Sequence, residues 1–255
     1  LFSQKDNRGS VVDIDPFGSP TKYFDCSIRA TMHGGLLSVT ATDMQVLHGL
    51  AKNACKRKYY GVPIKTEYSN EIAIRLILGC LYAVSGRLGI QIIPQFVQTH
   101  MHYYRIFVKV LTKKDQNQNL GYISHCFECG NRIVEKKSSS CCDKCNGELN
   151  SAGPLWIGQL FDKKFVNNML NEIPKFIVDK KCVGILEKSV SEAEMPATYY
   201  TLDKIASKIK GAPIKMKNAI KILQDTGYLA SPTSLNPTGF RTNCTIDEVV
   251  KLFKN

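Results

Sequence analysis

Alternating runs of hydrophobic and polar residues predict strands and helices in the first part of the chain. Residues 11–14 (VVDI) are rich in β-branched side chains and predict a strand. This strand must end by Pro16, because proline has no N–H to donate to a sheet. Residues 23–32 have helical spacing, with the glycine pair at 34–35 expected to end the helix, and residues 36–43 predict a second strand.

The next segment continues an α/β pattern. Residues 67–88 predict a long amphipathic helix, because apolar and small residues recur there at three- and four-residue steps. Residues 90–97 and 103–111 predict the two strands of a hairpin that completes the sheet. The order strand, helix, strand, helix, strand, strand predicts that the first two strands are parallel, which places Asp15 and Asp43 at the same edge.

The carboxyl part of the chain predicts further helices and a small domain. Residues 161–173 predict a helix, and Trp156 before it is expected in a core rather than stacked on a nucleotide. Residues 202–210 and 216–223 predict two more helices. Glycine and proline residues between 227 and 239 then predict a short hairpin, which gives this part a winged-helix-like outline.

Four of the ten cysteines form two CxxC pairs. The pairs are Cys126 with Cys129 and Cys142 with Cys145. Each CxxC turn brings two thiolates to one point, so the four predict a closed, structural zinc site in a zinc ribbon. Cys141 could replace Cys142 as a ligand, but only Cys142 keeps the CxxC spacing. The same cysteines could instead form a redox-active CxxC or two disulfides, and His125 is expected to be a bystander.

Basic residues exceed acidic ones, with 34 Lys and Arg against 22 Asp and Glu, a net charge of +12 and a pI near 9.2. A surplus of this size indicates a polyanionic partner, and nucleic acid is the default candidate. Lys56, Arg57 and Lys58 lie beside two tyrosines, which suits phosphate contact and base stacking. Lys217 and Lys221 lie one helical turn apart, opposite an apolar stripe. Both groups could equally be part of a solvated surface.

Hydropathy gives no sign of a membrane or secreted partner. No stretch reaches the roughly 20 apolar residues that span a bilayer. Residues 1–10 have no apolar signal core, so secretion is not expected. Without secretion, ten cysteines favour metal binding over a disulfide framework. We therefore expect an intracellular, reducing compartment, either cytoplasm or nucleus.

The end of the first predicted strand carries the candidate chemistry. Asp15, Pro16 and Phe17 follow this strand, at the edge where ligands bind in open α/β sheets. The Asp15 carboxylate and the Pro16 carbonyl can accept the two N–H groups of an exocyclic amine, while Phe17 stacks on the base. The alternative is an ordinary strand-ending turn, because proline and glycine mark turns in many proteins.

Residues 15–18 (DPFG) resemble the Asp/Asn/Ser-Pro-Pro-Tyr/Phe signature of amino-methyltransferases, with one proline in place of two and Phe17 in the aromatic position. A wider set of segments resembles the tRNA guanine-26 N2-dimethyltransferase family. These segments are VVDIDPFGSP, GGLLSVTATD, TEYSNEIAIRLILG, HYYRIFVKV, a Cys-rich insertion and GPLWIGQLFDKKFV. The resemblance covers nearly the whole chain.

The resemblance implies an α/β fold made of the C-terminal half of a Rossmann-like methyltransferase sheet, a zinc-ribbon insertion and a small α+β winged-helix-like domain. The corresponding segments are residues 1–115, 116–195 and 196–255. It also implies methyl transfer from S-adenosylmethionine to the exocyclic N2 of guanosine 26 in tRNA. Asp15, Pro16 and Phe17 are the implied catalytic residues.

In this family, a glycine-rich loop and an acidic residue that hold the cofactor precede the segment matched here, and neither has a counterpart before Ser10. We therefore expect the cofactor site upstream of Leu1 and expect this chain alone to bind S-adenosylmethionine weakly or not at all. The alternative function is a non-catalytic RNA-binding module built from the zinc ribbon and the winged helix. A DNA amino-methyltransferase, which shares the Asp-Pro pair, is a third possibility.

Overall fold

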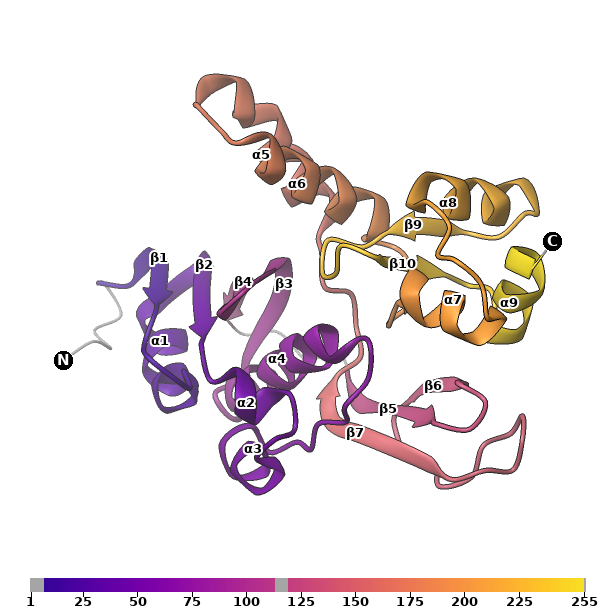
Figure 1. Ribbon diagram of the computed structural model, residues 1–255. Coiled ribbons are helices and arrows are strands. Elements are labelled where there is room, and N and C mark those ends of the chain that lie inside the picture. The colour runs from indigo at the N-terminus through magenta and orange to yellow at the C-terminus, as the bar shows by residue number, and fades with distance from the viewer. Residues whose placement is uncertain (1–6, 113–118, 255) are drawn as a thin grey trace.

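The structure is a computed structural model that describes residues 7–112 and 119–254. Its first part is a four-stranded sheet in the order β1-β2-β4-β3 (Figure 1). The strands are β1 (Gly9–Ile14), β2 (Thr31–Ala41), β3 (Ile90–His100) and β4 (Tyr103–Thr112). β1 and β2 are parallel, whereas β4 is antiparallel to both of its neighbours. The four predicted strands and the parallel first pair are confirmed, and the predicted hairpin inserts β4 between β2 and β3.

The glycines predicted to end the first helix lie within a strand, so that prediction is wrong. Helix α1 (Phe24–Ala30) ends where Thr31 adopts an extended conformation and begins β2. The pairing of β1 with β2 is irregular between Thr31 and Leu36. Gly34, in that irregular stretch, has a φ of +78°, which residues with a side chain rarely adopt. Gly34 and Gly35 therefore allow β2 to bulge.

Helix α4 (Ser69–Arg87) packs on one face of this sheet and also contacts α1 (Figure 1). It is predicted to be amphipathic, but every residue from Glu71 to Tyr82 is buried. The sheet covers one side of the helix and strand β7 (Leu149–Trp156) covers another. A Cβ added at Gly79 would lie only 2.9 Å from Cα of Leu155. The second packing partner explains why the helix has no solvated face between Glu71 and Tyr82.

A second, three-stranded sheet has the order β6-β5-β7. β5 (Leu120–Cys126) pairs antiparallel with both β6 (Arg132–Glu135) and β7. Trp156, at the end of β7, is buried and stands edge-on to Tyr82 of α4. The prediction that this ring belongs to a core is confirmed. The predicted boundary between residues 115 and 116 lies outside the described residues.

Two helices form a hairpin that projects from the rest of the molecule (Figure 1). α5 (Lys163–Glu172) begins where Asp162 Oδ1 accepts a hydrogen bond of 2.8 Å from the Phe165 N–H, which confirms the helix predicted here. A 3-10 turn (Ile173–Lys175) leads toward α6 (Lys180–Glu192), which the sequence pattern does not predict. The two helices pack on each other, and α5 also contacts β3.

The carboxyl part is a small α+β unit with its own hydrophobic core. Its elements are β8 (Tyr200–Thr201), α7 (Leu202–Ile209), α8 (Met216–Asp225), β9 (Ala230–Pro232), β10 (Gly239–Thr242) and α9 (Ile246–Lys254). The strands form an antiparallel sheet in the order β8-β10-β9. The two predicted helices and the hairpin are confirmed. α9 is not predicted, although its Val249 and Phe253 belong to this core.

Two short helices, α2 (Met44–Leu47) and α3 (Lys52–Tyr59), lie between β2 and α4. The basic segment that begins at Lys52 is thus helical. Over residues 7–112 and 119–254, the structure contains no helix that is both long enough and apolar enough to span a membrane.

A buried ion network joins α4, α6 and the carboxyl unit. Nε of Arg241 on β10 lies 2.6 Å from Oε2 of Glu192 on α6, and its Nη1 lies 3.0 Å from Oε2 of Glu71 on α4. Arg75 pairs with Glu71 at 2.8 Å and donates to the Trp156 carbonyl at 3.0 Å. Burial alone would raise the pKa of Glu71, but the charges of Arg241 and Arg75 lower it to about 2. The network therefore holds the carboxyl unit against the sheet domain through paired charges.

Candidate active site and metal centre

Asp15, Pro16 and Phe17 form the loop that follows β1. The Asp15 side chain is 58% exposed, and the ring of Phe17 is fully exposed. Two hydrogen bonds fasten this loop to the end of β2: the Gly18 N–H donates to Thr42 Oγ1 at 2.7 Å, and the Thr42 N–H donates to the Gly18 carbonyl at 3.0 Å. The carboxylate and the aromatic ring lie at the carboxyl end of a parallel strand, which is the position that the sequence predicts, and both are open to solvent.

One arginine of β4 reaches both acidic side chains at the end of β1. Arg105 Nη2 lies 2.7 Å from Asp13 Oδ2, and Nη1 lies 3.9 Å from Asp15 Oδ2. Asp13 lies in β1 and Asp15 directly follows it, and both carboxylates lie within 4 Å of the Arg105 guanidinium. Arg105 is in register with Thr40 of the intervening strand β2. The sequence pattern does not single out Arg105, because only the order of the strands brings β4 within reach of β1.

Asp43 follows β2 at the same edge as Asp15, as predicted, but its carboxylate has a structural role. It accepts hydrogen bonds from Tyr59 Oη at 2.6 Å and from Lys58 Nζ at 3.2 Å. Burial and the charge of Asp43 raise the pKa of Tyr59. Asp43 therefore anchors α3 to the end of β2.

Four of the five basic residues predicted to contact RNA are exposed. Lys56 and Arg57 lie on α3, and Lys217 and Lys221 lie on α8. Within the described ranges, none of these four forms an ion pair. Lys58, the fifth, is only partly exposed and pairs with Asp43. The four exposed cations are therefore available to an anionic partner, and their role stays a prediction.

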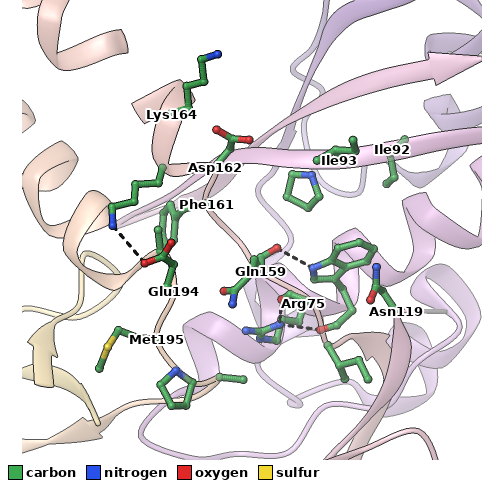
Figure 2. A pocket seen from close by; sticks show the side chains of 18 of the residues that line it. Arg75, Ile92, Ile93, Asn119, Gln159, Phe161, Asp162, Lys164, Glu194 and Met195 are labelled. Carbon is green, nitrogen blue, oxygen red and sulfur yellow. Dashed lines mark hydrogen bonds and ion pairs between the residues drawn. The ribbon is translucent and has the colours of Figure 1, made fainter. Parts of the chain in front are cut away.

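A cavity of about 920 Å³, whose lining residues Figure 2 shows, includes none of the residues of this corner. Ile92 and Ile93 of β3 line one wall, and Phe161 and Asp162, just before α5, line another. β3 runs in the same direction as β1, so its first half is at the opposite end of the sheet from Asp15. The corner formed by residues 15–17 is an open surface that this cavity does not include.

The four predicted metal ligands come together in space. Their Sγ atoms all lie within 4.8 Å of one another, and the ligands are Cys126, Cys129, Cys142 and Cys145. The Sγ–Sγ distance is 3.4 Å between Cys126 and Cys145 and 3.7 Å between Cys129 and Cys142. Burial would raise the pKa of the Cys142 thiol, but the backbone N–H groups of Lys144 and Cys145 lower it to about 6. This pKa favours the thiolate form that binds metals.

Cys141 and His125 remain outside the cluster. Cys141 is exposed, and its Sγ lies 3.6 Å from the carbonyl oxygen of Asn146. His125 Nδ1 is hydrogen-bonded to Tyr68 Oη at 2.9 Å. All ten cysteines lie within the described residues, and each is a free thiol. The cluster can therefore bind a metal ion through four sulfur atoms.

Arg132, three residues after Cys129, links the cysteine-containing sheet to its neighbours. Its guanidinium carbon lies 4.4 Å from the ring centroid of Tyr68 and 4.0 Å from that of Tyr200. It also pairs with Glu67 and donates to the Tyr199 carbonyl at 2.7 Å. The start of α4, the sheet formed by β5, β6 and β7, and the carboxyl unit thus meet at one side chain.

The family model for N2,N2-dimethylguanosine tRNA methyltransferase matches residues 1–254. The chain belongs to this family. A tRNA (guanine(26)-N(2))-dimethyltransferase of Methanosphaera stadtmanae is 34% identical over 261 residues, covering 96% of this chain and 66% of the relative. A tRNA (guanine(26)-N(2)/guanine(27)-N(2))-dimethyltransferase of Aquifex aeolicus is 32% identical over 250 residues, covering 94% of this chain and 62% of the relative.

A solved member of the N2,N2-dimethylguanosine tRNA methyltransferase family has the same fold. Trm1 from Pyrococcus horikoshii, in complex with S-adenosyl-L-methionine, matches with a TM-score of 0.83 and 29% identity. The match covers 95% of this chain and 65% of that chain. The family indicated by the sequence segments is therefore confirmed, and the chain spans about two thirds of the length of the relatives it matches.

Proposed function

We propose that the protein methylates the exocyclic N2 of guanosine 26 in tRNA, with S-adenosylmethionine as the methyl donor. Family membership and the names of the relatives support this reaction. The observation that carries the proposal is the end of β1, where Asp15, with a carboxylate that is 58% exposed, and Phe17, with a fully exposed ring, lie on one short loop. A ring with its faces in water offers a stacking platform for a nucleobase taken out of the RNA stack.

The roles of the three residues follow from their chemistry. Asp15 accepts one N–H of the guanine amino group, the Pro16 carbonyl accepts the other, and Phe17 stacks on the base. S-adenosylmethionine, when bound, supplies the electrophilic methyl group. The amine becomes strongly acidic as it is methylated, and Asp15 accepts the proton that it loses.

We propose that the four-stranded sheet is the C-terminal half of a Rossmann-like methyltransferase sheet. The parallel pair β1 and β2, followed by an antiparallel strand inserted before β3, supports this assignment. β1 is the edge strand of the described sheet, and its Val11 is 64% exposed. An unpaired edge of this kind can accept further strands. We infer that the cofactor is held mainly by parts of the family fold beyond this edge, and we assign none of its ligands to the described residues.

We infer that the cysteine cluster holds Zn²⁺ in a zinc ribbon. Sulfur ligands about 2.3 Å from a tetrahedral ion lie about 3.8 Å from one another. The Sγ–Sγ distances of 3.4 and 3.7 Å are close to this value. Four thiolates leave no open coordination position, so the ion is structural. Free thiolates persist in reducing compartments, which supports an intracellular location.

We propose that tRNA is the partner and that residues 196–255 form a winged-helix-like unit that contacts its backbone. The exposed Lys217 and Lys221 of α8 support this proposal. Lys56 and Arg57 of α3 provide a second basic group, near the end of β2. Residues 1–115 would then hold the reacting base, and residues 116–195 would fix the two parts relative to each other.

The test is Asp15→Ala in the protein expressed from its complete gene. We expect the rate of methyl transfer from labelled S-adenosylmethionine to tRNA to fall by about 100-fold or more, because a general base or key orienting group contributes about 10²–10⁴. The matched control is Asp25→Ala, which removes an exposed carboxylate from α1 and should leave the rate unchanged. A near-normal rate for Asp15→Ala would contradict the assignment.

A second candidate function is non-catalytic binding of tRNA by the zinc ribbon and the carboxyl unit. The cysteine cluster and the exposed Lys217 and Lys221, which can bind metal and phosphate without any catalytic group, favour this alternative. It predicts that the complete protein binds tRNA but transfers no methyl group. A DNA amino-methyltransferase predicts instead that duplex DNA competes effectively with tRNA for binding.

A further inference from the structure

The guanidinium of Arg105 contacts its two carboxylates unequally. The Nη2 contact with Asp13 is short, at 2.7 Å, whereas the Nη1 contact with Asp15 is long, at 3.9 Å. Guanidinium groups favour short, bidentate pairs with carboxylates. Because the short contact is made to Asp13, the oxygen atoms of Asp15 remain available to another donor.

The sheet fixes the backbone of Arg105 and the loop that carries Asp15. β4 lies between β2 and β3, and Arg105 is in register with Thr40 of β2 and Gln98 of β3, so its backbone is held inside the sheet. The guanidinium carbon lies 5.6 Å from the ring centroid of Phe107 on the same face of β4. On the other side, Thr42 holds the backbone of the Asp15 loop at Gly18. The loop that carries Asp15 is thus fastened at Gly18, and the Asp15 carboxylate lies 3.9 Å from the Arg105 cation.

We propose that Arg105 and Asp13 are positioning residues for Asp15. Arg105 orients the Asp15 carboxylate toward the amino group of the substrate, and Asp13 restrains Arg105 so that it does not form a close pair with Asp15. This inference rests on the proposed function, because it assigns Asp15 to the methylation site. Neither Asp13 nor Arg105 needs to touch the nucleobase.

This arrangement predicts that the effect of replacing Asp13 depends on whether Arg105 is present. Asp13→Asn removes the charge that holds Arg105, so the guanidinium moves onto Asp15 and competes with the substrate amine for its oxygen atoms. Arg105→Ala leaves Asp15 without an orienting partner. Once Arg105 is absent, Asp13 has nothing to restrain, and Asp13→Asn should cause no further loss.

The test is a double-mutant cycle in the protein expressed from its complete gene, with kcat and the KM for tRNA measured separately. Asp13→Asn and Arg105→Ala should each lower kcat by about tenfold or more, as expected for a misplaced reacting group. The KM for tRNA should not change. The double variant should be no slower than Arg105→Ala, and Arg105→Lys should be faster than Arg105→Ala. The matched control is Arg29→Ala, which breaks an exposed Arg–Asp pair of 2.8 Å on α1 and should keep the wild-type kcat.

Three results would overturn the inference. These are a normal kcat for Asp13→Asn, losses that multiply in the double variant, and an effect confined to the KM for tRNA, which would assign Arg105 to the RNA backbone. Thermal melting of each variant shows whether a loss of activity comes from unfolding. If Arg105→Ala does not fold, Arg105→Lys, which keeps the positive charge, takes its place in the comparison. If Asp15→Ala is inactive while Asp13→Asn is normal, only this inference fails. If Asp15→Ala is active, the proposed catalytic role of Asp15 fails as well.

Discussion

Replacing Arg241 should lower the free energy of unfolding by more than breaking a surface ion pair does. Arg241→Met deletes the charge and keeps an unbranched side chain. The change removes the contacts with Glu192 at 2.6 Å and Glu71 at 3.0 Å, together with hydrogen bonds of 3.0 and 3.1 Å to the Pro196 and Thr198 carbonyls. Both glutamates are buried, so water cannot replace the lost guanidinium.

Two physical estimates of the stability lost in Arg241→Met agree. Removing one partner of a buried ion pair costs about 3–5 kcal/mol. The pKa of Glu71 is lowered from its ordinary value of 4.5 to about 2, which corresponds to on the order of 3 kcal/mol of stability. Because Arg75 still pairs with Glu71, we expect the lower end of the range, about 3 kcal/mol, for Arg241→Met at neutral pH.

The same lowered pKa sets the direction of a pH dependence. A carboxylate whose pKa is lower in the folded state stabilises that state above its unfolded pKa, and the contribution is lost as the pH falls through the folded pKa. For Glu71, the contribution is complete above pH 4.5 and disappears toward pH 2. The difference in stability between Arg241→Met and wild type should therefore shrink as the pH is lowered through this window.

The assay is urea unfolding followed by the fluorescence of Trp156, the single tryptophan, whose carbonyl accepts a hydrogen bond from Arg75 of the network. The matched control is Arg29→Met, which breaks an Arg–Asp pair of similar length on the surface of α1. The control should lose no more than about 1 kcal/mol. An equal, small loss for the two variants at neutral pH would refute the stabilising role of the buried network.

Three further predictions concern the metal, the RNA contacts and the link between modules. A strong chelator should unfold the zinc ribbon and lower the melting temperature, because structural zinc contributes on the order of 10 kcal/mol to such modules; unchanged melting would argue against a bound metal. Replacing Lys217 and Lys221 together by alanine should reduce the salt slope of tRNA binding by roughly 1.5, at ~0.7–0.9 for each phosphate contact. Lys58→Ala should change that slope by less than the ~0.7–0.9 of one phosphate contact, because Lys58 already pairs with Asp43. Arg132→Lys loses a planar group stacked between Tyr68 and Tyr200, and should cost about 1 kcal/mol in urea unfolding.

Local patterns in the sequence predict most of the elements and the metal ligands. The β-branched run before Pro16 predicts β1, and the CxxC spacing selects Cys142 over Cys141. α9 carries a signal that would have identified it: the Thr245 N–H donates to Glu248 Oε2 at 2.7 Å and the Glu248 N–H donates to Thr245 Oγ1 at 3.4 Å, which is a capping box at the start of the helix. Such signals depend only on neighbours in sequence, so they can be interpreted without the fold.

Features created by distant segments could not be predicted in this way. Arg105 reaches Asp13 and Asp15 only because β4 lies next to β2, and no local pattern fixes that order. α4 loses its solvated face only because β7 packs on it. The open surface around Phe17 also depends on which strands and helices flank the loop. The candidate chemistry at Asp15 was therefore visible in the sequence, whereas its positioning partners required the structure.

The most direct measurement is mass spectrometry of nucleosides from a tRNA transcript incubated with the complete protein and S-adenosylmethionine. Two transcripts are compared, one with guanosine at position 26 and one with inosine, which lacks only the exocyclic amino group. The account predicts N2-methylated guanosine from the first transcript and no methylation at position 26 of the second. Methylation of the inosine, or an unmodified guanosine 26, would contradict the claim that the end of β1 presents this amino group for methyl transfer.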